Sequence, residues 1–180
     1  GTELTLRLGT SDDVLHTGLA AALKEDLAAC GARLEIQSLP AASLLAPWPE
    51  GPAWSGQFDL ILWAWPVLHS PPCEMFAGWE VPGEENPQGV NASGWSDAQY
   101  DEACRLLVNG LRGEASYAAA AARTQERLAS ELPALALFLR PRLVATRPEI
   151  CGLTADSTAL TVLVDLEESA RGEACSRPDG

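Results

Sequence analysis

The sequence predicts an α/β fold in which a mixed, mostly parallel sheet is flanked by helices and accompanied by an α-helical hairpin. Three observations carry this prediction. A strand pattern, a helix pattern and a second strand pattern follow one another from residue 3, a nearly continuous apolar run covers 58–65, and two helical patterns follow in tandem from residue 96. With 180 residues, 47% of them hydrophobic, the chain has enough apolar material for one compact domain.

The first 40 residues predict a βαβ unit. Residues 3–9 alternate leucine with polar side chains, which is the period of a strand with one buried face. The helix that follows has N-cap oxygens at Thr10, Ser11 and Asp12, leucines at 15, 19, 23 and 27, and a stop at Gly31. Leu34 and Ile36 alternate in a second strand that ends before Pro40. Because the joints are short, we expect the two strands to be parallel.

The middle of the chain predicts a third strand and a long loop. A short helix is expected over 41–48, and the apolar run 58–65 predicts a strand at the centre of a sheet covered on both faces, beside the first strand. Residues 66–95 are rich in proline and show little periodicity beyond a turn of helix at 74–78. Long loops of this kind are where binding residues tend to lie.

The last part predicts two helices and further strands. Ser96 is expected to cap a helix whose inward stripe comprises Tyr100, Ala103, Cys104, Leu107, Val108 and Leu111. A second helix over 114–132, with Tyr117, Ala121, Leu128 and Leu132 inward, should pack antiparallel to it and end at Pro133. Strands are expected over 134–140, 143–146 and 160–164, and a frayed polar tail beyond Glu167.

Composition excludes several classes of partner. The 25 acidic and 12 basic side chains give a net charge of −13, which repels phosphate backbones, so nucleic acid is not expected as a partner. No apolar run is long enough to cross a bilayer, and residues at the start lack the pattern of a signal peptide, so we expect the chain as given to be soluble.

Five cysteines indicate disulfides in an oxidising compartment. They are widely spaced and form no CxxC or Cys/His cluster, so no metal site is expected. An odd number leaves at least one thiol without a partner in the chain, and spacing alone does not give the pairing.

Catalytic signatures are absent from the sequence. It contains no nucleophile elbow, phosphate-cradling loop, dinucleotide-binding glycine motif or HExxH motif, which argues against an enzyme, and no cofactor is expected. Of the two histidines, His16 is expected to be a solvated helix residue, whereas His69 in the long loop is kept as a candidate ligand contact.

The tryptophans are more informative. All six lie between residues 48 and 95, around the predicted third strand and its loop. Trp63 and Trp65 are two residues apart and therefore share a face at the carboxyl end of that strand. Open α/β sheets place their ligand crevices at such ends, so the two indoles predict a binding site.

A collinear series of segments resembles the second lobe of family 5 extracellular solute-binding proteins, the peptide and nickel class of ABC importers. The series comprises Leu-Thr-Leu-Arg-Leu-Gly-Thr (4–10), Ala-Arg-Leu-Glu-Ile-Gln (32–37), Phe-Asp-Leu-Ile-Leu-Trp-Ala-Trp (58–65), Asn-Ala-Ser-Gly-Trp-Ser-Asp (91–97) and Glu-Leu-Pro-Ala-Leu-Ala-Leu-Phe-Leu-Arg-Pro-Arg (131–142). The resemblance covers roughly residues 3–165, and its specificity lies in the order of the segments rather than in any single motif.

The resemblance implies a periplasmic-binding-protein-like lobe that captures a small solute without catalysis. Residues 1–147 would form the second lobe, and residues 148–180 a segment crossing towards a missing N-terminal lobe, followed by the tail. The implied partners are a membrane permease and the missing lobe, with a homodimer of the isolated lobe as an alternative, in an extracellular or periplasmic lipoprotein. The expected ligand-binding residues are Trp63, Trp65, His69, Asn91 and Trp95.

The same resemblance suggests cysteine pairs and a solute class. Cys73 with Cys104 would join the loop to the helical hairpin, Cys151 with Cys175 would tie down the tail, and Cys30 would remain a buried thiol. Peptide-binding members place an aspartate where Leu68 stands, so a free peptide amine would lack its partner. We therefore expect a peptide-like or other uncharged or apolar solute that is not held through a free amine.

Other function classes stay open at this point. A ligand-sensing or protein-interaction domain of the same fold is the first alternative. A hydrolase using Asp59 or Asp101 with His69 is the remote one, although no spacing supports it. Asp59 is instead expected to form hydrogen bonds near the start of its strand.

Overall fold

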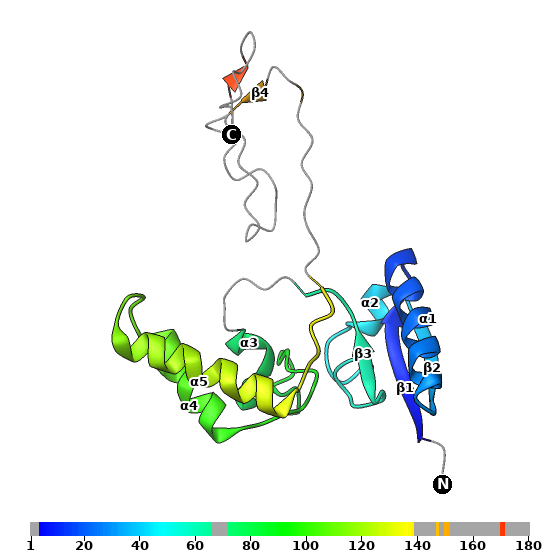
Figure 1. Cartoon of the computed structure of the whole chain (residues 1–180), viewed down its shortest axis with the longest axis horizontal. Helices are drawn as coiled ribbons and strands as arrows, with labels where there is room; N and C mark the ends of the chain where they lie inside the picture. Colours follow the sequence, from blue (N-terminus) through cyan, green and yellow to red (C-terminus); the bar gives the residue numbers. More distant parts are fainter. Residues whose placement is uncertain (1–3, 66–71, 139–146, 148–149, 152–169, 172–180) are drawn as a thin grey trace. The chain divides into compact units, whose positions relative to one another are not determined.

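The computed structural model describes residues 4–65, 72–138, 147, 150–151 and 170–171 (Figure 1). The predicted α/β class is confirmed. The chain divides into two compact units, Gly1–Trp65 with His69–Leu135, and Pro66–Leu68 with Ala136–Gly180. In the described part of the chain, no helix has the length and apolar character needed to cross a membrane.

The sheet of the first unit is a parallel three-stranded layer in the order β2-β1-β3. It comprises β1 (Leu4–Ser11), β2 (Ala32–Leu39) and β3 (Leu60–Leu62), with α1 (Val14–Ala29) and α2 (Ala41–Leu44) in the connections. The register pairs Leu8 with Ile36 on one side and with Leu60 on the other. The predicted parallel βαβ unit and the placement of the third strand beside the first are confirmed.

The first helix begins one residue later than the sequence suggested. Asp13, rather than Thr10, Ser11 or Asp12, is the N-cap, and its carboxylate accepts hydrogen bonds from the backbone N–H groups of Leu15 and His16. The predicted stop is confirmed, because Gly31 follows the C-cap with φ 81°, a conformation that favours glycine.

The face of α1 that packs on the sheet differs from the predicted leucine stripe. Ala20 is fully buried against Leu8 and Leu34, and Leu23 and Leu27 pack on this core, but Leu15 is 39% exposed. A spacing of four residues drifts around a helix of 3.6 residues per turn. The inward stripe therefore starts at position 16 rather than at 15.

The third strand is shorter and lies further out than predicted. Only Leu60–Leu62 pair with β1, and among the described strands β3 is at the edge of the sheet while β1 occupies the centre. Phe58, at the start of the predicted run, packs on the sheet instead of pairing in it. The Phe58 ring lies over β1 so closely that a Cβ added to Gly9 would be 2.4 Å from it, so glycine is required there.

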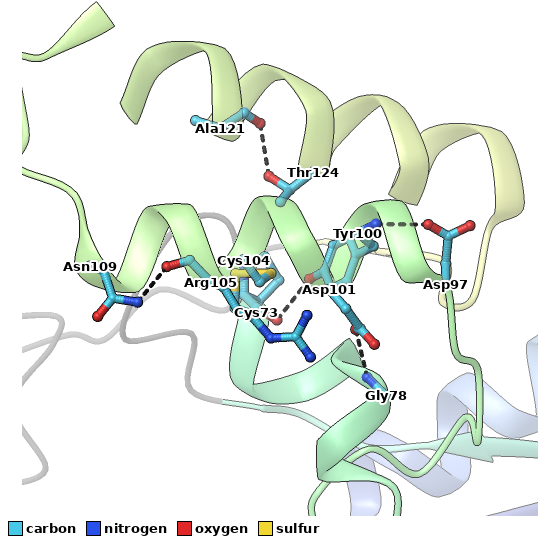
Figure 2. Close-up of a disulfide and its surroundings, with 11 residues drawn as sticks. Cys73, Gly78, Asp97, Tyr100, Asp101, Cys104, Arg105, Asn109, Ala121 and Thr124 are labelled. Carbon is cyan, nitrogen blue, oxygen red and sulfur yellow. Dashed lines mark hydrogen bonds between the residues drawn. A yellow bond between two sulfur atoms is a disulfide. The ribbon is translucent and has the colours of Figure 1, made fainter. Parts of the chain in front are cut away.

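The second part of this unit is a helical layer around a disulfide. It comprises α3 (Cys73–Phe76), the 3-10 turn η1 (Gly78–Glu80), α4 (Ala98–Asn109) and α5 (Ala115–Glu131). The latter two form the predicted antiparallel hairpin (Figure 1). A disulfide joins Cys73 to Cys104, the pair that the sequence suggested, and Tyr100 is fully buried beside it (Figure 2).

Several predicted inward positions of these helices face solvent instead. Asp97, not Ser96, caps α4. Val108 is 74% exposed, Leu111 70% and Leu132 57%. These three residues lie at or beyond the last turns of the helices, where the hairpin has no further layer to cover them in the described chain. The other predicted inward residues of α5, Tyr117, Ala121 and Leu128, do pack on the buried core of the hairpin.

The lone cysteine and the end of the chain also differ from expectation. Cys30 has a free and exposed thiol, because the C-cap position of α1 faces outward. Residues 134–138 form no strand. In the second unit, β4 (Ile150–Cys151) pairs antiparallel with β5 (Ala170–Arg171), and β5 lies within what was expected to be a frayed tail beyond Glu167. His69, Leu68, Cys175 and the strands predicted at 143–146 and 160–164 lie outside the described residues.

Candidate functional site

Two of the predicted binding residues follow the carboxyl end of β3. Trp63 and Trp65 come directly after Leu62, whose carbonyl accepts a hydrogen bond of 3.0 Å from the buried Thr10 hydroxyl of β1. This bond fixes the point at which the chain leaves the sheet. The indoles therefore lie where the carboxyl ends of neighbouring parallel strands meet, as ligand sites of open α/β sheets do.

A third tryptophan, which the sequence did not single out, joins them. Trp54 belongs to the loop between α2 and β3, and its backbone N–H donates to the Gly51 carbonyl at 3.0 Å. The neighbouring Ala53 is buried, and its backbone N–H donates a hydrogen bond to the Leu44 carbonyl, which holds the loop in place. Gly51 is necessary here, because a Cβ would lie 1.8 Å from the Ala46 oxygen and 2.7 Å from the Trp54 ring.

The three indoles form one cluster, which we call the tryptophan cluster (Trp54, Trp63 and Trp65). The ring centroids are 5.9 Å apart for Trp54 and Trp63, 5.9 Å for Trp63 and Trp65, and 6.4 Å for Trp54 and Trp65. The interplanar angles of 62° to 84° make all three contacts edge-to-face. Each residue is only partly buried, so the cluster retains surface for a ligand.

A polar group stands at the same edge of the sheet, where β1 ends. His16 is 8% exposed rather than solvated as predicted, and its Nδ1 lies 2.7 Å from the Ser11 hydroxyl and also contacts the Asp13 carboxylate. Hydrogen bonds from Ser11, and then from His16, hold the pKa of Asp13 far below its usual range. No sequence motif indicates this group, because Ser11 ends a strand, Asp13 is a helix cap and His16 lies in the first helical turn.

This polar group does not have the arrangement of a catalytic triad. A triad needs the serine on one ring nitrogen and the carboxylate on the other. Here Ser11 and Asp13 both contact Nδ1 of His16. The three residues therefore tie the helix start to the strand end.

Two other predicted ligand residues belong to the helical layer. Asn91 is fully buried, and its Nδ2 donates to the carbonyls of Ala77 at 3.0 Å and Trp95 at 2.8 Å. Its Oδ1 accepts from Ser93, so this side chain anchors the loop before α4. Trp95 packs edge-to-face on Tyr100 with centroids 5.0 Å apart.

The carboxylates of the hydrolase alternative are also engaged in structure. Asp59 accepts from the backbone N–H of Arg7 at 2.8 Å and from its guanidinium, which together hold the pKa of Asp59 below its usual value. This is the hydrogen-bonding role near the strand start that the sequence predicted. Asp101 accepts from the Gly78 N–H at 2.8 Å (Figure 2).

Within the described residues, two further observations bear on binding. No three His, Cys, Asp or Glu residues there are grouped to hold a metal ion. A hollow of about 500 Å³ lies elsewhere, lined by Arg7, Glu35, Ile36, Gln37, Gln57 and Phe58. Its lining is mainly polar and includes none of the tryptophan cluster.

Two solved structures of binding proteins share the fold of this chain. No family model and no curated protein matches the sequence. NikZ from Campylobacter jejuni, solved in complex with Ni(L-His), matches with a TM-score of 0.56 and 18% identity, over 72% of this chain and 25% of that one. A peptide-binding protein of a peptide ABC transporter matches with a TM-score of 0.57 and 13% identity, over 74% of this chain and 56% of that one. The chain thus shares the fold of part of these proteins and spans a quarter to about half of their length.

Proposed function

We propose that this chain forms the second lobe of a receptor that captures a small solute for an ABC importer and performs no catalysis. The observation that carries the proposal is the position of the tryptophan cluster. It lies at the carboxyl end of a parallel sheet, in a fold shared with portions of a nickel-complex-binding and a peptide-binding protein. The solute would rest on Trp63 and Trp65, and a second lobe would complete the cleft.

The chemistry of the chain agrees with a location outside the cytoplasm. The Cys73–Cys104 disulfide suits an oxidising compartment, either periplasmic or extracellular. In this proposal the partners are a membrane permease and a preceding lobe, and the intact receptor is anchored as a lipoprotein.

The test is a solute panel of peptides, sugars, polyamines and metal chelates, scored by thermal shift and tryptophan fluorescence. It is run on the 180-residue chain and on the full gene product in parallel. A solute that binds the native state raises its melting temperature. We expect one class to raise that of the full product strongly and that of the chain weakly, because the chain supplies only part of the cleft.

Matched variants locate the effect. Trp63→Ala should abolish the shift, whereas Trp79→Ala, an exposed tryptophan of the helical layer that contacts Arg105, should leave it intact. No shift with any solute would contradict the receptor and favour an interaction module. An equal shift in the chain and the full product would mean that the site is complete without a second lobe.

A further inference from the structure

Charge is distributed unevenly along the sequence, and the acidic stretch is the one that holds the tryptophans. Between Arg33 and Arg105 the sequence holds no lysine or arginine, but ten aspartates and glutamates and all six tryptophans. The acids of this stretch are Glu35, Glu50, Asp59, Glu74, Glu80, Glu84, Glu85, Asp97, Asp101 and Glu102. Four of these ten acids are paired with arginines that lie outside the stretch: Asp59 with Arg7, Glu35 with Arg33, Glu102 with Arg105 and Asp97 with Arg127. A surplus of negative charge in the same stretch of chain as the indoles attracts cations and repels anions.

The planes of the tryptophan cluster suit a rounded group better than a flat one. A sugar ring or an aromatic ligand stacks on one indole face or between parallel faces. These three planes meet at 62° to 84°, so no two of them form a parallel slot and a flat ligand can stack on only one ring at a time. A compact tetrahedral group can instead contact all three rings at once.

The separations of the rings fit the range of cation–π interactions. Such an interaction requires the cation over the face of a ring and within about 6 Å of its centroid, and tryptophan is the best of the aromatic partners. Because the three centroids are only 5.9 to 6.4 Å apart, a single cation above their centre lies within that range of every ring.

We propose that Trp54, Trp63 and Trp65 bind a quaternary or methylated ammonium group. The inference rests on the proposed function and names the class of solute that this site takes. It replaces the sequence-based expectation of an uncharged solute. A methylated ammonium presents an apolar surface, as that expectation required, and it also carries a positive charge, which the faces of indole rings attract.

The decisive experiment compares two probes of the same shape on the 180-residue chain. Choline and its neutral carbon analogue 3,3-dimethylbutan-1-ol differ in charge and hardly in size. Titration followed by tryptophan fluorescence and calorimetry should give at least about tenfold tighter binding of choline. Added salt should reduce this preference, because the long-range part of the attraction is screened.

Variants then assign the preference to the cluster. Trp54→Ala is the sharpest, since it removes the ring that only the structure places in the site, and it should bring choline down to the affinity of the neutral probe. Trp54→Phe retains a weaker ring and should keep part of the preference. Trp79→Ala is the control and should change neither affinity.

Each result separates this inference from the proposal on which it rests. Equal binding of the two probes would overturn the cation site and leave an apolar solute site. Binding of neither probe, with a thermal shift from another member of the panel, would overturn the inference and leave the receptor. Absence of binding by every solute, in both the chain and the full gene product, would overturn both.

Discussion

The helical layer and the tryptophan cluster both contain aromatic rings in edge-to-face contact, but the contacts have different roles. In the helical layer, Trp95 meets Tyr100 edge-to-face at 5.0 Å, and Tyr100 is fully buried with its hydroxyl on the Pro72 carbonyl. Burial there raises the pKa of the Tyr100 hydroxyl well above its usual value. In the tryptophan cluster the rings are 5.9 to 6.4 Å apart and partly exposed. The first set is built on a fully buried ring, Tyr100, whereas every ring of the second set is partly exposed.

The difference follows from how each region is held together. The helical layer is fixed by a disulfide, by a buried asparagine and by the Asp97 cap of α4, and the polar groups of the asparagine and of the cap already form hydrogen bonds within the protein. At the end of the sheet, backbone hydrogen bonds and glycines position the indoles, leaving the side chains free to meet a solute. A predicted ligand residue can therefore be sorted by asking whether its polar atoms are already engaged.

Removing the disulfide should break the helical layer and spare the sheet. The Cys73→Ala/Cys104→Ala double variant opens a link between residues 31 apart in sequence and should lower the free energy of unfolding by about 3 to 4 kcal/mol. Native-state hydrogen exchange should show lost protection in α4 and α5 and little change in β1 and β2. The control is Cys30→Ser, which alters an exposed free thiol and should change little.

An equal loss of protection in both regions would contradict this separation. The sheet and the helical layer would then unfold as one cooperative unit, and the comparison drawn above would hold for side chains but not for stability.

Two glycine-to-alanine substitutions test the packing of the sheet region, and we expect them to change its stability in opposite directions. Gly9→Ala forces the Phe58 ring to move from a contact of 2.4 Å and should cost about 1 to 3 kcal/mol as overpacking. Gly18→Ala, inside α1 with nothing within 4 Å of the new Cβ, should stabilise by up to about 1 kcal/mol. Urea unfolding of both variants measures the free energy of unfolding, which should fall for Gly9→Ala and rise for Gly18→Ala. A tolerated Gly9→Ala would mean that Phe58 is not fixed on the sheet.

Local patterns were sufficient to predict most elements of the fold. The βαβ unit, the stop at Gly31 and the helical hairpin each rest on periodicity or on one capping residue. Orientation was harder to predict. Leucines at every fourth position of α1 drift around the helix, so the sequence suggested Leu15 where the structure buries His16. The packing of Phe58 over Gly9 joins residues 49 positions apart in the sequence, and no local pattern encodes it.

The candidate site was only half visible in the sequence. Trp63 and Trp65 could be assigned to one face because they flank a single residue near a strand end. Trp54 reaches them through an irregular loop whose course depends on Gly51 and on the bond from Ala53 to Leu44. A loop of this kind has no period, so its one sequence signal was the gathering of tryptophans in the middle of the chain.

The smallest effect concerns the charge that links the two long helices. Asp97 caps α4 through the Tyr100 N–H and also meets the Arg127 guanidinium of α5 at 2.6 Å. That guanidinium is the main reason why the pKa of Asp97 lies below its ordinary value of 3.8. Because the folded pKa is the lower one, the charged carboxylate stabilises the fold above about pH 4, and its contribution is lost as the pH falls through the folded pKa.

Asp97→Asn isolates that charge, since asparagine also caps helices well. At pH 7 the variant should melt a few degrees below the wild type, and the gap should close as the pH falls below about 4. Thermal melts across that range, with Asp12→Asn as a control at an exposed carboxylate, measure the difference. A gap that stays constant with pH would assign the loss to packing, and the helical layer would then owe its rigidity to the disulfide and its core rather than to this ion pair.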